Sequence, residues 1–245
     1  MDEDVPMEST QSKEARKASY MKQAKAEVDK YRTRLEDERW HPVTYKEGTG
    51  ISAYEMEALG DGYYLKADGI VEKFAEDIAR AHRDHNHISR ISWDGANIHD
   101  IGLLEDISHR PVDKQGNEFW LTVNYALHKP RVPAVSMREF VYLEFAWRMP
   151  SQTVPGQDKW VILACHTDHP KRPPRKDPVR ALSRTIMVLE PRQPLVSPDA
   201  SDTPRTSVTI MAWVDPGGDI PAAVIKLYKT ILADRIAWLR TIQFV

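Results

Sequence analysis

The sequence contains only one cysteine, Cys165, in 245 residues. A single thiol excludes an intramolecular disulfide and any metal site built from several thiolates. No apolar stretch approaches the ~20 residues that a membrane-spanning helix needs. We therefore expect a soluble, cytoplasmic protein. We expect neither a metal nor a cofactor.

The sequence also lacks an excess of either charge. It has 34 Lys and Arg against 36 Asp and Glu, for a formal net charge of −2. A surface that binds duplex nucleic acid is strongly basic, so we expect no nucleic-acid partner. With 41% hydrophobic and 29% charged residues, the chain as a whole is not of the disordered class. Its length is sufficient for one large hydrophobic core.

Motifs of common enzyme classes are missing as well. There is no nucleophile elbow, no phosphate-binding P-loop and no dinucleotide-binding glycine motif. His82, Asp84, His85 and His87 have the composition of a metal site, but no second cluster with ligand spacing accompanies them. A solvated helix end is the simpler interpretation of this run. We expect no catalytic residue and no enzymatic activity.

The chain divides into three parts. Residues 1–12 are polar and acidic, which predicts a disordered tail. Residues 13–39 place apolar side chains at steps of three and four, as an amphipathic helix does. The third part, residues 40–245, is expected to form one domain. We expect the helix to dock onto this domain, with binding of a protein partner as the alternative.

Within the third part, β-forming stretches alternate with turn residues. They predict strands at 43–45, 51–57, 63–67, 119–126, 139–147, 160–167, 179–189 and 206–214. Helices are expected at 68–82 with Asp68 as the N-cap, at about 98–107, and at 221–241 with Pro221 in the first turn. A largely antiparallel sheet followed by a terminal helix is an α+β arrangement.

The terminal helix has a wide apolar arc that a sheet must cover. Tyr228, Ile231 and Leu232 belong to this arc, and Arg235 lies in the middle of it. An unpaired buried charge costs several kcal/mol, so Arg235 needs an anionic partner from the protein or from a ligand. The alternative is that Arg235 extends to water near an open part of the helix.

A loop at residues 171–176 packs four cations into six residues: Lys171, Arg172, Arg175 and Lys176. Two prolines between them keep the loop extended. Attraction to an anionic membrane surface is worth about 1 kcal/mol for each basic residue close to it. The loop is therefore a candidate membrane contact, with a solvated turn as the alternative.

Several short motifs occur together in one order along the chain. They are Trp93-Asp94 before the helix expected at 103–107, Arg138-Glu139-Phe140-Val141, Val179-Arg180, and Asp215-Pro216-Gly217-Gly218-Asp219-Ile220-Pro221. In this order and spacing they resemble the START domain, the lipid-transfer domain related to the steroidogenic acute regulatory protein. The resemblance covers roughly residue 40 to the C-terminus.

The resemblance implies a helix-grip fold, in which a curved antiparallel sheet wraps around a long C-terminal helix and encloses a tunnel for one lipid. The implied function is non-catalytic transfer of a lipid between membranes, with a phospholipid favoured and a sterol next. The residues expected to contact the ligand are Glu144, Arg235, Tyr142, Phe140, Asn124, Tyr228, Leu232 and Ile231. A helix-grip cyclase or hydrolase, and a lipid-sensing module that recruits a protein partner, are the alternatives.

Two positions depart from the family pattern. The asparagine common in the first turns of the terminal helix is replaced by the region of Ile225 and Lys226. Glu144 stands where some members that carry sterols or phospholipids have an inward arginine, six residues after the arginine of the Arg138 motif. Alternation along residues 139–147 puts Phe140, Tyr142 and Glu144 on one face of the strand. The other face is apolar too, so alternation leaves open which face lines the tunnel.

Overall fold

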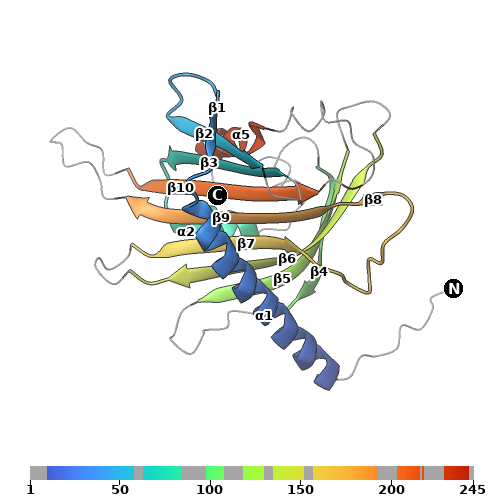
Figure 1. Cartoon of the computed structure of the whole chain (residues 1–245). Helices are drawn as coiled ribbons and strands as arrows, with labels where there is room; N and C mark the ends of the chain where they lie inside the picture. The colour runs from blue at the N-terminus through green and yellow to red at the C-terminus, as the bar shows by residue number, and fades with distance from the viewer. Residues whose placement is uncertain are drawn as a thin grey trace.

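The computed structural model describes residues 10–57, 63–83, 98–107, 118–129, 135–151, 157–192, 203–215, 217 and 229–242. Three helices and ten strands lie within these residues (Figure 1). The helices are α1 (Thr10–Leu35), α2 (Ala75–Arg83) and α5 (Ile231–Thr241). The strands are β1 (His41–Val43), β2 (Ile51–Glu57), β3 (Tyr63–Val71), β4 (Ile98–Asp106), β5 (Phe119–His128), β6 (Arg138–Met149), β7 (Lys159–His166), β8 (Val179–Arg180), β9 (Leu182–Arg192) and β10 (Arg205–Asp215).

The strands form one curved sheet in the order β1-β2-β3-β10-β9-β7-β6-β5-β4, with β8 paired to β6 off this path. Neighbours along the path are antiparallel, and only the short β8 runs parallel to its partner. The last strand in the sequence, β10, pairs with β3 in the middle of the sheet. It thereby joins the three N-terminal strands, β1 to β3, to the other strands. The expected antiparallel sheet followed by a terminal helix is confirmed.

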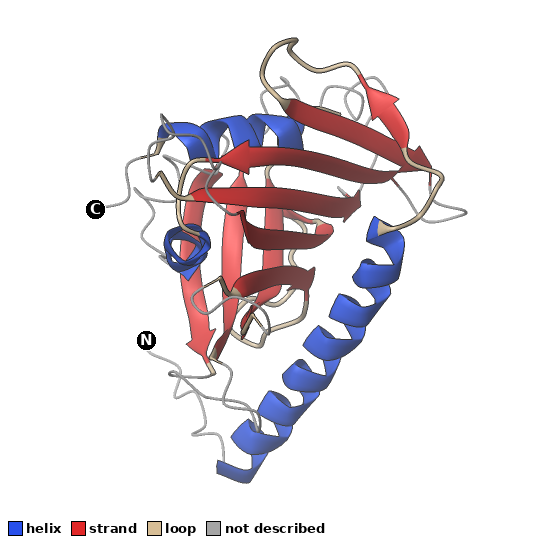
Figure 2. Ribbon diagram, turned by 90° about the vertical axis from the view of Figure 1, so that its left-hand side faces the viewer, coloured by secondary structure: helices blue, strands red, loops and turns tan. Residues whose placement is uncertain are grey.

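Helices cover both faces of this sheet. Figure 2 shows α1 on one side of the strands and α2 and α5 on the other. The α5 face of the sheet carries Trp120, Ala146, Ile162, Met187 and Ile210, which share one apolar cluster with α5. The α1 face carries Leu121, Leu143, Leu163, Ile186 and Met211, which share a second cluster with α1. Strand β6 is apolar on both faces because helices cover both faces of the sheet.

A glycine in β3 lets α5 approach the sheet closely. A Cβ atom at Gly69 would lie 2.8 Å from Cγ2 of Ile236, so only a residue without a side chain fits under the helix there. Arg240 fixes the far end of α5, because its guanidinium donates hydrogen bonds to the carbonyl oxygens of Ile70 (2.8 Å) and Thr49 (2.5 Å). These contacts place α5 over β2 and β3.

Two sequence predictions about local structure are wrong. The helix expected at about 98–107 is strand β4, which forms the sheet edge next to β5 and has two irregularities in its pairing register. Asp68 is not a helix N-cap. It lies in β3 and accepts a hydrogen bond from the Thr209 hydroxyl (2.7 Å), because pairing with β10 continues as far as Val71. In both places, pairing with a neighbouring strand outweighs local helix signals.

The N-terminal helix has slightly different ends from those expected. It begins at Thr10, within the stretch expected to be tail. It ends at Leu35 because the following residues form a turn, in which the Trp40 indole donates a hydrogen bond to the Arg34 carbonyl (3.0 Å). The expected docking of this helix onto the rest of the chain is seen.

Candidate functional site

A polar patch lies on the otherwise apolar α5 face of the sheet. In β5 and β6, Thr122 is paired with Glu144, and Asn124 is paired with Tyr142. All four side chains are at least 93% buried. These four residues, called the polar patch below, share their face with Ala146 and Trp120 of the α5 cluster. The register thus places Glu144 on the α5 face.

Asn124 has unused hydrogen-bonding capacity. Its side chain is fully buried, and its amide nitrogen donates to the Thr122 hydroxyl (2.9 Å). Its amide oxygen finds no hydrogen-bond partner within the part of the chain that the structure describes. Because a buried acceptor without a donor costs about 1–3 kcal/mol, this oxygen is suited to a ligand that brings a donor.

The expected ligand contacts on the terminal helix divide between two sides of α5. Leu232 and Ile236 are buried against the sheet, whereas Ile231 is 41% exposed and points outward. Arg235 is half-buried and lies about 100° around the helix from Ile236, at the flank of the buried side rather than at its centre. Tyr228 lies outside the described residues.

Phe140 and Tyr142 continue the α5 face toward β4. With Ile98, Ile101 and Ala126 they form a third apolar cluster. The structure therefore brings Phe140, Tyr142, Asn124 and Glu144 together, and Leu232 lies on the buried side of α5, which packs on the same face. Of the expected contacts within the described residues, Ile231 points away from this face and Arg235 lies at its flank.

The basic loop, residues 171–176, has its cations in two different environments. Lys171 is exposed, with its ammonium group 3.0 Å from the Leu104 carbonyl oxygen. Arg172 turns inward, where it contacts Glu139 and stacks 3.7 Å from the centre of the Tyr125 ring. Arg175 and Lys176 are exposed. The surface charge of the loop thus comes mainly from three of its four cations.

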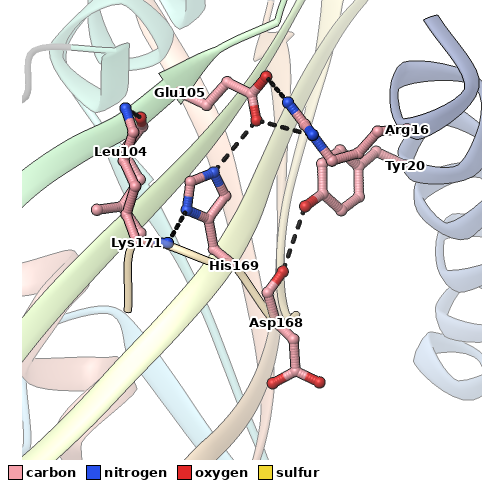
Figure 3. Close-up of polar contacts among 7 residues, drawn as sticks. All are labelled: Arg16, Tyr20, Leu104, Glu105, Asp168, His169 and Lys171. Carbon is pink, nitrogen blue, oxygen red and sulfur yellow. Dashed lines mark hydrogen bonds and ion pairs between the residues drawn. The ribbon is translucent and has the colours of Figure 1, made fainter. Parts of the chain in front are cut away.

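Helix α1 is held to the α1 face by a charged cluster beside the basic loop (Figure 3). Arg16 reaches Glu105 of β4 with two hydrogen bonds of 2.7 and 3.2 Å. His169 contacts the same carboxylate at 3.2 Å and accepts a hydrogen bond from the Lys171 backbone N–H (3.3 Å). The Tyr20 hydroxyl donates to the Asp168 carbonyl oxygen (3.2 Å).

The cluster shifts the acid–base behaviour of its members. Burial lowers the pKa of His169 below its ordinary value and outweighs the hydrogen bond to Glu105, which acts in the opposite direction. Burial raises the pKa of Glu105, but the hydrogen bonds from Arg16 and His169 outweigh it and leave that pKa below its ordinary value. At neutral pH the cluster therefore contains a neutral imidazole, a carboxylate and a guanidinium.

Among the described residues, no group of three or more His, Cys, Asp or Glu side chains has the arrangement of a metal site. His82 is buried in α2, and the other members of its run, Asp84, His85 and His87, lie outside the described residues. No helix in the described part of the chain is long and apolar enough to cross a bilayer.

The sequence of this chain matches a known domain family. The START domain family matches residues 21–241 of the chain. The chain belongs to the START domain family. The match begins inside α1, so most of the N-terminal helix lies within the matched region of this START domain.

Solved structures show the same helix-grip fold. Human StAR-related lipid transfer protein 5 superposes with a TM-score of 0.69 and 19% identity, covering 91% of this chain and 96% of that chain. Human STARD10 superposes with a TM-score of 0.61 and 20% identity, covering 98% of this chain and 81% of that chain. At these identities the likeness establishes the fold of this START domain.

Curated relatives match over a shorter region. The ceramide transfer protein of Homo sapiens is 32% identical over 108 residues, which is 42% of this chain and 17% of that protein. The ceramide transfer protein of Xenopus laevis gives the same identity and coverage. The chain thus belongs to a family of lipid-transfer proteins, and it matches less than a fifth of the length of these relatives.

One member of the polar patch was not predicted from the sequence. Thr122 supports the Asn124 amide and faces Glu144 across the strands, yet a single threonine in a β-rich stretch carries no functional signal by itself. The available signal was the spacing: Thr122 and Asn124 are two residues apart in an apolar strand, so both must lie on one face.

Proposed function

We propose that this START domain takes up one lipid between the α5 face of its sheet and its C-terminal helix, and transfers the lipid between membranes without catalysing a reaction. The supporting observation is the polar patch of Thr122, Asn124, Tyr142 and Glu144, buried within a face whose other members are largely apolar. Apolar walls with a few oriented polar groups are typical of sites that bind amphipathic small molecules.

The chemistry of the patch favours a lipid whose head group donates hydrogen bonds. The carboxyl group of Glu144 and the amide oxygen of Asn124 are acceptors in an environment from which water is largely excluded. A phosphate group offers only acceptors and would oppose the charge of a Glu144 carboxylate. A lipid with hydroxyl and amide N–H groups matches these acceptors, and ceramide, for which the 32%-identical relatives are named, is such a lipid.

Arg235 supports the second candidate, a phospholipid. Its side chain is half-buried at the flank of α5, where a planar guanidinium could hold a phosphate through two parallel hydrogen bonds. The two candidate lipids differ in the residue that contributes most to binding of the head group. A hydroxyl- and amide-bearing lipid depends on Glu144, and a phospholipid depends on Arg235.

We further propose that the basic loop brings the protein to anionic membranes. Lys171, Arg175 and Lys176 are exposed on one loop, and the exposed Leu103 of β4 precedes the residue whose carbonyl binds Lys171. Three cations supply about 3 kcal/mol of attraction at an anionic surface. An exposed apolar side chain nearby can enter the membrane interface.

Lipid competition tests the head-group proposal. The purified protein is incubated with vesicles of phosphatidylcholine, ceramide and cholesterol, re-isolated, and its bound lipid is identified by native mass spectrometry. We expect ceramide to be enriched and Glu144→Gln to reduce that enrichment. Glu14→Gln, which makes the same chemical change on the exposed face of α1, should leave it unchanged.

The opposing results are equally specific. Enrichment of phosphatidylcholine that Arg235→Lys abolishes, with no effect of Glu144→Gln, would assign the site to a phospholipid. Wild-type protein that carries no lipid above an unrelated control protein would refute lipid binding altogether. Chemical conversion of any of the lipids by the protein would favour a helix-grip enzyme.

A further inference from the structure

A buried carboxylate joins three segments of the chain at one end of the sheet. Glu139, near the start of β6, is 1% exposed. Its Oε2 atom lies 2.9 Å from Arg180 of β8, and its Oε1 atom lies 3.4 Å from Arg172 of the basic loop. We call Arg138, Glu139, Arg172 and Arg180 the ionic corner. The Glu139 carboxylate thus has a short contact with Arg180 and a longer one with Arg172.

Arg172 is the member of the ionic corner that can exchange partners. Its side chain is 25% exposed, against 13% for Arg180, and its distance to the carboxylate is the longer of the two. If Arg172 leaves, Glu139 keeps its short contact with Arg180, so the carboxylate is never left buried without a cation. A lipid phosphate would offer Arg172 two parallel, charge-assisted hydrogen bonds in place of the long contact.

Arg180 connects Arg172 to the end of β10. Its guanidinium donates a hydrogen bond to the Arg172 carbonyl oxygen (2.7 Å). Its own carbonyl oxygen packs against Gly217, where an added Cβ atom would lie only 2.8 Å away. A displacement of the loop at Arg172 therefore acts directly on the residue against which Gly217 packs.

Gly217 is also held from the β6 side. The Arg138 guanidinium donates to the Gly217 carbonyl oxygen (3.2 Å), and the Gly217 N–H donates to the Asp215 carboxylate (2.9 Å). The glycine has a φ of 63°, a conformation that other residues rarely adopt. The ionic corner thus fixes the position at which the chain leaves β10 on its way to α5.

We propose that Arg172 and Glu139 are positioning residues that couple membrane contact to the backbone at Gly217, just after the end of β10. When the basic loop meets an anionic membrane, Arg172 exchanges Glu139 for lipid phosphate, Arg180 loses the carbonyl of Arg172, and the backbone at Gly217 is released. This inference rests on the proposed exchange of lipid at membranes. It explains why one cation of the basic loop is turned inward.

Amide hydrogen exchange of the full chain measures the coupling directly. The Gly217 N–H is the reporter, in the presence of vesicles of phosphatidylcholine alone or of phosphatidylcholine mixed with phosphatidylserine. We expect the anionic vesicles to speed exchange at Gly217 about tenfold, as when an opening equilibrium loses about 1.4 kcal/mol of protection. Phosphatidylcholine vesicles should not change it.

Two variants with the same change in charge separate coupling from simple attraction. In Arg172→Gln, exchange at Gly217 should already be fast without vesicles and should show no further response. In Arg175→Gln, whose side chain is exposed in the same loop, vesicle affinity should fall while the response of Gly217 at saturating vesicles stays intact. Lipid uptake, measured in parallel, tests the proposed function separately.

Two results would overturn the coupling. Wild-type protein bound to anionic vesicles with unchanged exchange at Gly217 would do so, and this measurement does not depend on any variant folding. Identical behaviour of Arg172→Gln and Arg175→Gln would show that the loop contributes charge alone. Either result could occur with normal lipid uptake, so the coupling can fail while the proposed lipid binding stands.

Discussion

The close contact between α5 and Gly69 of β3 allows a quantitative prediction. In Gly69→Ala, the new Cβ atom would lie 2.8 Å from Cγ2 of Ile236 and 3.2 Å from Cγ1 of Ile51. Isoleucine is branched at Cβ and has little freedom to move its Cγ2 atom, so the helix must shift. Overpacking of this kind costs about 1–3 kcal/mol, and reduced flexibility of the unfolded chain returns about 0.4–1 kcal/mol. We expect a net loss of about 1–2 kcal/mol in the free energy of unfolding.

A double-mutant cycle isolates the contact. Ile236→Ala removes Cγ2 and by itself should cost about 2–5 kcal/mol, because this side chain is fully buried. In the double variant the clash is gone, so the total loss should be smaller than the sum of the two single losses by about 1 kcal/mol or more. Urea unfolding followed by tryptophan fluorescence provides all the values.

Leu143→Ala is the matched control for this cycle. Leu143 is equally buried but lies on the α1 face, away from α5. Combined with Gly69→Ala, its effect should be additive within about 0.5 kcal/mol. Additivity in the Ile236 cycle as well, or a Gly69→Ala protein as stable as the wild type, would refute the close approach of α5 to β3.

Three further predictions concern the α1 face. The free energy of unfolding should fall as the pH drops below about 6.5, because the lowered pKa values of His169 and His166 let the unfolded chain take up protons first. Urea titrations at several pH values should show a shallower fall for His169→Gln. An unchanged dependence of the unfolding free energy on pH in this variant would exclude His169 as a cause. Burial raises the pKa of Cys165 to about 12, so iodoacetamide should label it only when the chain unfolds, and rapid labelling of the folded protein would contradict its burial. Arg16→Gln should lower the free energy of unfolding by about 1–2 kcal/mol in urea, since the burial of its ion pair with Glu105 is intermediate between that of exposed and buried pairs. The control Lys22→Gln, at an exposed position of α1, should have almost no effect. Equal effects of the two variants would argue against docking of α1 through the Arg16–Glu105 pair.

The fold was largely predictable because most strands have strong local signals. Stretches such as β5 and β10 are rich in β-branched and aromatic residues and are bounded by turn residues. Strand β4 was mistaken for a helix because the apolar residues of its Ile-Gly-Leu-Leu stretch do not alternate with polar ones, and its pairing with β5 is irregular. Pairing between residues that are 16 to 30 positions apart in the sequence cannot be read from a local pattern.

The candidate site was only partly predictable. Alternation could group Phe140, Tyr142 and Glu144, but it could not say which face of β6 they occupy, because α1 covers the other face and makes it apolar as well. The inward turn of Arg172 was also hidden, since its partner Glu139 is 33 residues away and looks in the sequence like an ordinary strand residue. Both facts depend on tertiary contacts.

Filling the α5 face tests the central claim most directly. Ala164 of β7 lies on this face, paired with Glu144, so a bulky side chain there would occupy the space proposed for the lipid. Ala164→Trp and the control Ala26→Trp, on the exposed surface of α1, are incubated with vesicles, re-isolated and weighed by native mass spectrometry, with folding confirmed by circular dichroism. The account predicts one lipid per chain in the wild type and the control, and none in the folded Ala164→Trp protein. Full lipid occupancy of that variant would contradict a binding site on the α5 face.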